Sequence, residues 1–477
     1  MLAGQTLFFS AATKERGYEL WKSDGAAAGT AELKDIRVGS VGATPLKLTA
    51  AGSRLYFWAN QGTGYDLWKS DGTAGGTVLV KATPIITPAG QSPVGPVQAL
   101  AVGSSVIFNQ GGENWWSDGS TAGTVSLNVQ SNGGLPTLPN YAILGPEVFF
   151  PGRRAGGFLG LWKFNTALGA AAEVVPKITP ETLITLGSGI VYWQAGDLWR
   201  TDGTLAGTKR IVTLPAPAAG RPRAGTGAHP SWLIKGDKLY FGSDELYVTD
   251  GTLAGTKLVR DIFPGEDSAG NRNESKPYDL VLLNGTIYFA ATTELGRELW
   301  KTDGTSAGTV LVKDVRAGVC SSGTAELAVL GSKIYFNAND GIHGGELWES
   351  DGTTDGTVMI TDLYPGTASS YPVDLTPLNG KLYFIASSYT AGREFWVFDP
   401  NTVEEGVPAL SIASLGNGVQ LSWPVSFKTW NLEYSSTLNT GSWIPVVAPW
   451  VDSATEHTVV VPFAPANPAR SFRLRRN

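Results

Sequence analysis

The fold of this chain is decided by the stretch Glu298-Leu299-Trp300-Lys301-Thr302-Asp303-Gly304-Thr305-Ser306-Ala307-Gly308-Thr309. Copies of it are centred on an aromatic residue at positions 21, 68, 116, 162, 199, 247, 300, 348 and 396. The intervals between these anchors are 47, 48, 46, 37, 48, 53, 48 and 48 residues. A period of about fifty residues is typical of a propeller blade or a large solenoid repeat.

Each unit reads as four strands. Leu299-Trp300 places two apolar residues side by side, so a strand that carries them is covered on both faces. The apolar run Ile287-Tyr288-Phe289 predicts a second strand that is buried on both sides. Asp303-Gly304 predicts a turn, and Val310-Leu311-Val312 predicts a strand after it. With a weak strand over residues 279–283, the unit is a four-stranded antiparallel meander.

Sheets that are apolar on both faces must stack on similar sheets, and a radial stack is a β-propeller. A parallel β-helix is the competing repeat fold, but its rungs do not contain an antiparallel hairpin at every turn. We therefore predict an all-β protein whose residues 1–404 form a β-propeller of nine four-stranded units. Nine blades are expected, with an eight-blade ring and one displaced unit as the alternative.

The two ends of the repeat region are irregular. The first unit enters directly at Thr6-Leu7-Phe8-Phe9, so we expect it to lack its opening strand and to need an upstream segment. The ninth unit keeps Glu394-Phe395-Trp396 but shows no clear outer strand after it. Beyond Glu404-Glu405-Gly406 the period stops, and residues 407–477 alternate as short strands with one apolar face. This tail predicts a small immunoglobulin- or fibronectin-like β-sandwich.

Composition and net charge limit the classes of partner that the protein can have. The net charge is -6 and no basic face is apparent, which argues against nucleic acid. No run of about twenty apolar residues exists, so no membrane span is expected. The single cysteine, Cys320, excludes an internal disulfide. The N-terminus has no basic region followed by an apolar one, so it does not read as a signal peptide. We expect a monomer.

The recurring Glu-Leu-Trp-x-x-Asp-Gly-Thr resembles the bacterial ELWxxDGT-repeat proteins, also labelled hyalin-like repeat proteins. The tail, with Leu421-Ser422-Trp423-Pro424 and Phe472-Arg473-Leu474, looks like a C-terminal module of secreted proteins in verrucomicrobia-like bacteria. The resemblance implies a secreted or surface-exposed propeller and no particular reaction. We therefore expect an extracellular or cell-surface location.

Two acidic series run through the repeat. The first is interpreted as structural turn residues, since each has glycine next to it, and it comprises Asp24, Asp71, Asp118, Asp202, Asp250, Asp303 and Asp351. A calcium ring is the alternative for this series; otherwise we expect no metal and no cofactor. The second precedes Leu-Trp and is expected to pair with Lys or Arg, and it comprises Glu19, Asp66, Asp197, Glu245, Glu298, Glu346 and Glu394.

Variable loops are expected on one face of the propeller, where binding residues usually concentrate. The candidate binding residues there are Arg221, Arg223, His229, Glu266, Asp267, Asn271, Arg272, Asn273, Asp340 and His343. No residue is assigned a catalytic role. We predict a non-enzymatic surface binding or adhesion protein that takes a glycan or protein ligand on this face. The alternative is a carbohydrate-active propeller enzyme, a glycoside hydrolase or a lyase.

Overall fold

The computed structural model describes residues 1–4, 6–62, 64–82, 98–130, 141–214, 231–364, 366–388 and 392–401, and in the tail 411–415, 418–424, 430–435, 444–445, 451–452, 456–462 and 471–476. The chain divides into two compact units, Met1–Phe398 and Asp399–Asn477. Every described element is a strand except one short 3-10 turn, η1 (Ala27–Gly29). The predicted all-β class is confirmed.

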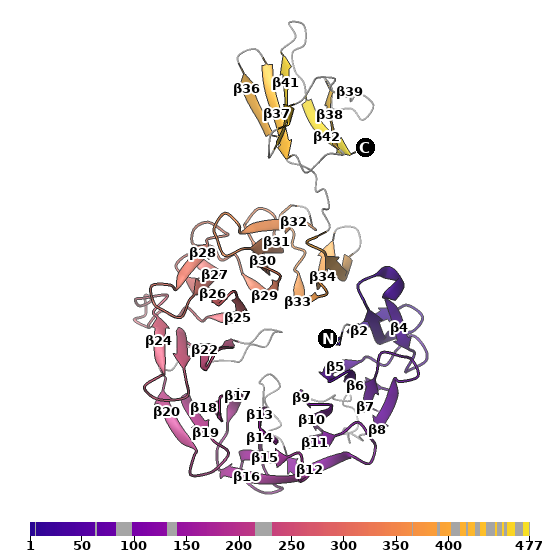
Figure 1. Cartoon of the computed structure of the whole chain (residues 1–477), viewed down its shortest axis with the longest axis vertical. Helices are drawn as coiled ribbons and strands as arrows, with labels where there is room; N and C mark the ends of the chain where they lie inside the picture. Colours follow the sequence, from indigo (N-terminus) through magenta and orange to yellow (C-terminus); the bar gives the residue numbers. More distant parts are fainter. Residues whose placement is uncertain are drawn as a thin grey trace. The chain divides into compact units, whose positions relative to one another are not determined.

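The first unit consists of nine antiparallel meanders, which are the predicted nine blades (Figure 1). Blades 1 to 3 contain β1 (Leu2–Ala3), β2 (Thr6–Thr13), β3 (Gly17–Ser23) and β4 (Ala31–Lys34); β5 (Leu46–Ala51), β6 (Arg54–Asn60), β7 (Tyr65–Ser70) and β8 (Val78–Lys81); and β9 (Gln98–Val102), β10 (Ser105–Gln110), β11 (Glu113–Ser117) and β12 (Thr124–Gln130). Blades 4 to 6 contain β13 (Ala142–Leu144), β14 (Glu147–Gly152), β15 (Gly160–Asn165) and β16 (Ala170–Pro176); β17 (Glu181–Leu186), β18 (Gly189–Gln194), β19 (Asp197–Thr201) and β20 (Lys209–Thr213); and β21 (Trp232–Lys235), β22 (Lys238–Gly242), β23 (Leu246–Thr249) and β24 (Lys257–Arg260).

Blades 7 to 9 contain β25 (Tyr278–Leu283), β26 (Thr286–Thr293), β27 (Gly296–Thr302) and β28 (Val310–Lys313); β29 (Ala325–Leu330), β30 (Lys333–Asn339), β31 (Gly345–Ser350) and β32 (Val358–Thr361); and β33 (Val373–Leu378), β34 (Lys381–Ser388) and β35 (Gly392–Phe398). Among the described residues, eight blades therefore have four strands and the ninth has three. The first strand of each blade lies towards the centre of the ring, and in the four-stranded blades the last strand lies at its rim (Figure 1).

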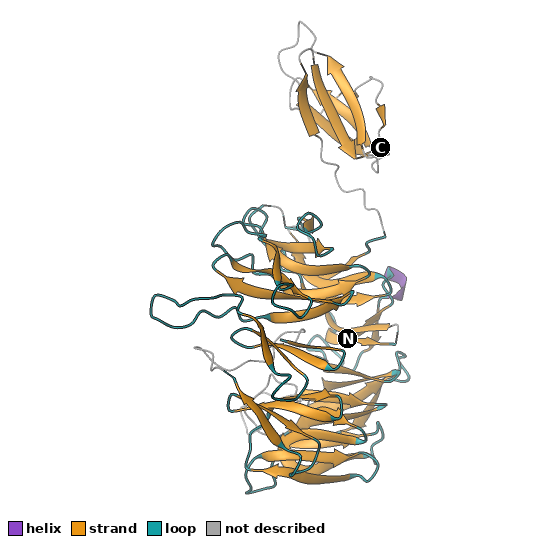
Figure 2. Cartoon of the chain, turned by 60° about the vertical axis from the view of Figure 1, so that its left-hand side comes forward, coloured by secondary structure: helices purple, strands orange, loops and turns teal. Residues whose placement is uncertain are grey.

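The core lies between blades, because each sheet is apolar on both faces. Leu20 of blade 1 and Trp68 of blade 2 belong to one buried cluster, in which they are 0% and 4% exposed. The leucine of the repeat thus faces the next blade, and the tryptophan faces the preceding one. Figure 2 shows the resulting stack of sheets. The adjacent Leu-Trp pair predicted this two-sided burial.

Two details of the repeat differ from the sequence prediction. In blade 3, Trp115 pairs with Phe108 as Trp68 pairs with Phe57, so Trp115 and not Trp116 is the equivalent anchor. Blade 1 has an opening strand after all, since Leu2–Ala3 pairs with β2. The prediction that it lacked one was wrong because two residues are too few to give a periodic signal.

Blade 9 packs against blade 1 and closes the ring. Leu7 of blade 1 and Tyr383 of blade 9 lie in one buried cluster. The rings of Phe9 and Phe395 stack with their centroids 4.9 Å apart. The described contacts that close the ring are thus side-chain contacts between two separate sheets.

The described residues of the second unit form two antiparallel sheets, one of four strands and one of three. Their strands are β36 (Ser411–Leu415), β37 (Gly418–Pro424), β38 (Trp430–Ser435), β39 (Ile444–Pro445), β40 (Val451–Asp452), β41 (Glu456–Pro462) and β42 (Ser471–Arg476). Two such sheets are compatible with the predicted small sandwich. In the described part of the chain no helix has the length and apolarity to cross a bilayer.

The packing predicts how much each anchor contributes to stability. Trp300 is 7% exposed, and replacing it with alanine should lower the free energy of unfolding by about 3–5 kcal/mol. Trp162 is 4% exposed, so Trp162→Ala should cost a similar amount, although the motif around it is degraded. Urea unfolding of the full chain measures both. A change below about 0.5 kcal/mol for Trp300→Ala would contradict the interblade core.

Candidate functional site

A buried glutamate precedes Leu-Trp in three blades and Leu-Tyr in a fourth, and it holds the connection to the next blade. Glu298 is 0% exposed and accepts hydrogen bonds from the backbone N–H groups of Val315 (2.9 Å) and Ser322 (2.8 Å). Equivalent bonds from connection amides reach Glu19, Glu245 and Glu346. The partners in these blades are therefore backbone amides and, for Glu245 and Glu346, also a serine hydroxyl, and not the Lys or Arg side chains expected from the sequence. Asp197 of the same series does pair with Arg210, at 3.4 Å.

The aspartate of Asp-Gly-Thr shapes the turn between the third and fourth strands. Asp71 Oδ1 accepts the backbone N–H (2.9 Å) and the hydroxyl (2.7 Å) of Thr73. A Cβ on Gly76 would lie 2.0 Å from the same oxygen, so the position requires glycine. A hydroxyl bond of this kind is the main cause that lowers the pKa of Asp71, Asp118, Asp202, Asp250, Asp303 and Asp351. Asp24 accepts the backbone N–H of Ala26.

Basic side chains connect blades 1, 2, 6 and 7 to the hairpin of the next blade. Lys69, which follows the tryptophan, donates to the carbonyl oxygen of Gly119 in blade 3 (2.7 Å). Lys34, at the end of β4, donates to the carbonyl oxygen of Thr77 (2.8 Å), and its Nζ lies 5.8 Å from the ring centroid of Trp68. Hydrogen bonds of these two kinds are also donated by the side chains of Lys22, Lys81, Arg260, Lys301 and Lys313. Such a lysine over an indole ring contributes about 0.5–1 kcal/mol at exposed sites.

In four blades the glycine of Asp-Gly packs against a tyrosine of the preceding blade. A Cβ on Gly119 would lie 2.4 Å from Tyr56 Oη, and a Cβ on Gly25 would lie 1.8 Å from Tyr383 Oη. Both glycines also have positive φ, +87° and +93°. The turn and the blade contact therefore require glycine for two separate reasons. The second pair joins blade 9 to blade 1.

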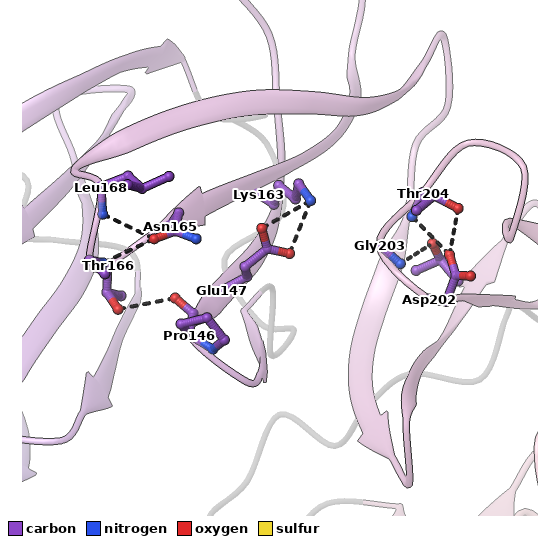
Figure 3. Close-up of polar contacts among 11 residues, drawn as sticks. Pro146, Glu147, Lys163, Asn165, Thr166, Leu168, Asp202, Gly203 and Thr204 are labelled. Carbon is purple, nitrogen blue, oxygen red and sulfur yellow. Dashed lines mark hydrogen bonds and ion pairs between the residues drawn. The ribbon is translucent and has the colours of Figure 1, made fainter.

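Blade 4 shows how a degraded copy of the motif is accommodated (Figure 3). Asn165 takes the place of the aspartate, and its Oδ1 accepts the backbone N–H groups of Ala167 (3.1 Å) and Leu168 (3.0 Å). Lys163 bonds to Glu147 within its own blade at 2.9 Å. The side-chain amide of Asn165 thus stabilises this turn, and Lys163 forms its ion pair within blade 4.

The outer edge of blade 9 departs from this pattern. Among the described strands, β35 pairs with β34 alone. Phe395 is 38% exposed, although the leucine at its position is 0% exposed in blade 7. Glu394 is exposed as well, whereas Glu298 is fully buried. Trp21, which faces blade 9 from blade 1, is partly exposed. The sequence signalled this edge through the missing outer strand of unit nine, but it did not mark these side chains.

The candidate residues in the connection from blade 6 to blade 7 are bonded largely to one another. Asp267 accepts the N–H of Asn271 (2.9 Å) and its side-chain amide (3.1 Å). Arg272 reaches back to the carboxylates of Asp244 (3.5 Å) and Asp261 (3.4 Å). Asn273 donates its side-chain amide to a carbonyl in the same connection, and Glu266 forms an isolated bridge with Arg272.

The remaining candidates lie elsewhere on the loops. Asp340 and His343 form a pair within one turn of blade 8, with Oδ2 and Nδ1 2.7 Å apart. This hydrogen bond is the main cause that raises the pKa of His343. Arg221, Arg223 and His229 lie outside the described residues. A ligand on this face therefore stays a prediction.

The described residues contain no group of three or more His, Cys, Asp or Glu side chains gathered as a metal site. Each turn aspartate already uses one oxygen in its own turn. The calcium alternative stays a prediction, as does the expectation that the protein carries no cofactor.

No family model and no curated protein matches the sequence. Solved structures do match. A puromycin hydrolase is 15% identical with a TM-score of 0.35, and the match covers 80% of this chain and 58% of that one. A Mycobacterium tuberculosis puromycin-hydrolyzing peptidase is 11% identical with a TM-score of 0.38 and the same coverage, 80% and 58%. A prolyl endopeptidase is 13% identical with a TM-score of 0.34, covering 80% and 54%. The chain spans a little over half the length of these structures.

The comparison corrects the predicted function. A non-enzymatic adhesion protein was expected, with a carbohydrate-active enzyme as the alternative, but these three matches are hydrolases and peptidases. Both predictions are therefore wrong. A blade repeat specifies a scaffold, and one scaffold carries many unrelated activities, so the pattern could not select among them. At this level of likeness the matches transfer no activity to this chain.

The lysine contacts predict a substitution that strengthens ring closure. Val397 of β35 occupies the position of Lys69 and Lys301, whose Nζ atoms donate to glycine carbonyls of the next blade at 2.7 and 2.8 Å. Val397→Lys should therefore reach the carbonyl oxygen of Gly25 and raise the free energy of unfolding by about 1 kcal/mol. Val397→Gln controls for the loss of an exposed apolar side chain. Equal stability of the two variants would contradict the contact.

The buried glutamates predict a pH dependence of stability. Burial raises the pKa of Glu298 from 4.5 to about 7, against the opposing effect of the two backbone amides. Between these values the folded state holds a proton that the unfolded state has lost, so the free energy of unfolding falls as pH rises from about 4.5 to 7, by an amount on the order of 2 kcal/mol.

Glu298→Gln should make the pH dependence measured in urea unfolding less steep but not abolish it, because burial also raises the pKa values of Glu19, Glu245 and Glu346. The matched control is Glu294→Gln, at an exposed position in the loop that precedes the same strand. If the free energy of unfolding of Glu298→Gln changed with pH as steeply as that of the wild type, Glu298 would have an ordinary glutamate pKa in the folded state.

Proposed function

We propose that the propeller binds an extended polypeptide segment at the outer edge of blade 9 by strand addition. The observation that carries this proposal is the pairing of β35, which among the described strands has a neighbour on one side alone. A strand edge presents a row of free N–H and C=O groups that an extended peptide can pair with.

Exposure of apolar side chains supports the same edge. Phe395 and Val397 of β35 are 38% and 48% exposed, and the two alternate with Glu394 and Trp396 along the strand. In the four-stranded blades the outer strand covers this part of the third strand. An added strand would therefore bury apolar surface as well as pair backbone groups.

The expected affinity is modest. A strand of four residues adds a few main-chain hydrogen bonds of about 1 kcal/mol each, and ordering the peptide and its side chains offsets part of this gain. A dissociation constant on the order of micromolar to millimolar follows.

The test uses the full chain and a labelled peptide with the sequence of residues 309–316, Thr-Val-Leu-Val-Lys-Asp-Val-Arg, which contains β28. Fluorescence anisotropy should show saturable binding. Hydrogen exchange should show new protection of amides in residues 392–398 and unchanged protection of β28. The control peptide has proline at its second and fourth positions, which removes two backbone donors.

Absence of saturable binding, or protection confined to other strands, would overturn the proposal. So would free protein in which the amides of β35 are already protected, because a segment of the same chain would then cover the edge. A second copy of the chain is the other occupant to be tested. In that case sedimentation of the free protein would show a dimer, and the amides of β35 would be protected in it.

A further inference from the structure

The outer strands of the other blades define which peptide the edge of blade 9 accepts. In blade 7, Lys301 pairs with Val310 and Trp300 with Leu311, and the register then shifts so that Leu299 pairs with Lys313. The same shift at the Leu-Trp step occurs in blades 1, 2, 6 and 8. An added strand at β35 would follow this register, with its first residue opposite Val397 and its fourth opposite Phe395.

The third residue of these outer strands is aliphatic and faces the next blade. Leu33, Val80, Val259 and Val312 hold this position and are 6%, 3%, 7% and 3% exposed. Leu33 lies in the cluster that contains Trp68 of the next blade. At blade 9 the corresponding surface is formed by Phe395 and by Trp21 of blade 1. An aliphatic third residue would cover both.

The fourth residue is basic in four of these five blades. Lys34 and Lys81 each place Nζ over the tryptophan of the next blade, 5.8 and 5.7 Å from the ring centroids of Trp68 and Trp115. Each also donates to the carbonyl of the next Gly-Thr threonine, Thr77 or Thr124. At blade 9 the equivalent receptors are the indole of Trp21 and the carbonyl oxygen of Thr30.

The residue two places further donates its backbone N–H to the repeat glutamate. Ile36, Ile262, Val315 and Leu363 do so to Glu19, Glu245, Glu298 and Glu346 at 2.9 to 3.1 Å. Glu394 holds the corresponding position in β35 and is exposed. It is therefore placed to accept the same N–H from a bound segment.

We infer that the partner segment at the edge of blade 9 is an extended peptide with an aliphatic residue, then Lys or Arg, then a polar residue and a further aliphatic residue. The basic side chain lies over Trp21, and the backbone N–H two residues later bonds to Glu394. This inference rests on the proposed strand addition and adds the chemistry that selects the segment.

The copies of this motif in the printed sequence do not supply the segment. Within the printed sequence an aliphatic residue followed by Lys or Arg and then Asp occurs at residues 33–35, 259–261 and 312–314. All three copies begin in outer strands of their own blades, β4, β24 and β28. Neither these copies nor those of a second molecule are free to add to β35.

The experiment compares the peptide Thr-Val-Leu-Val-Lys-Asp-Val-Arg with the same peptide carrying Gln in place of Lys, by anisotropy with the full chain. The lysine peptide should bind about tenfold more tightly. With Trp21→Leu the preference for lysine should fall to a few-fold, because the carbonyl oxygen of Thr30 remains as its second receptor. With Glu394→Gln both peptides should weaken by a similar factor, while the exposed control Glu294→Gln should leave both affinities unchanged.

A third peptide replaces the amide N–H of its penultimate residue with an ester oxygen. It should bind about tenfold less tightly to the wild-type protein and show a smaller loss with Glu394→Gln. Two outcomes would overturn the inference and leave strand addition standing. One is equal binding of the lysine and glutamine peptides to the wild-type protein. The other is a loss of affinity from the ester substitution that is the same in the wild-type protein and in Glu394→Gln. Failure of every peptide to bind would overturn both.

Discussion

The structure depends on the contact between the Asp-Gly hairpin of one blade and the side chains of the blade before it. Lysines from two strands of the preceding blade donate to carbonyl oxygens of the hairpin, and a tyrosine lies where a Cβ on the glycine would be. A blade that is apolar on both faces cannot be stable alone, because half of its core is supplied by each neighbour. The hairpin contact fixes how neighbours meet at the rim, and so one short motif serves both the turn and the ring.

The carboxylates of the two acidic series lie in different environments, and their pKa values shift in opposite directions. The turn aspartates lie near solvent and accept a hydroxyl and a backbone N–H, so their pKa values fall, as at Asp71. The glutamates before Leu-Trp are buried beneath the blade connections, so the pKa of Glu298 rises although its partners are hydrogen-bond donors. Desolvation outweighs the two amides there. The first series therefore favours the ionised form, and the second makes the connections sensitive to pH.

The repeat predicted the blade, the meander and the number of blades, because the period, the adjacent Leu-Trp pair and Asp-Gly are local signals. It missed β1, which is two residues long, and it misaligned blade 3, where Trp115-Trp116 offers two aromatic residues in succession. It also gave the glutamates the wrong partners. Backbone amides from a connection that begins about seventeen residues later leave no mark in the side-chain pattern, whereas Lys and Arg are visible in it.

The sequence signalled the edge of blade 9 through a missing outer strand, but it did not mark the exposed side chains there, because their exposure depends on what covers each of them. Outer strands such as β8, β28 and β32 are four residues long, and each is bulged against its neighbour. Short, bulged edges pair poorly with further strands. β35 is seven residues long and runs in unbroken register with β34, and it exposes Phe395 and Val397. Among the described strands of blade 9, a third strand is therefore the outermost one, and it is neither short nor bulged. In the four-stranded blades, the strand equivalent to β35 pairs with an outer strand. Glu394 and Phe395 of β35, together with Trp21 of blade 1, occupy the positions that contact such an outer strand.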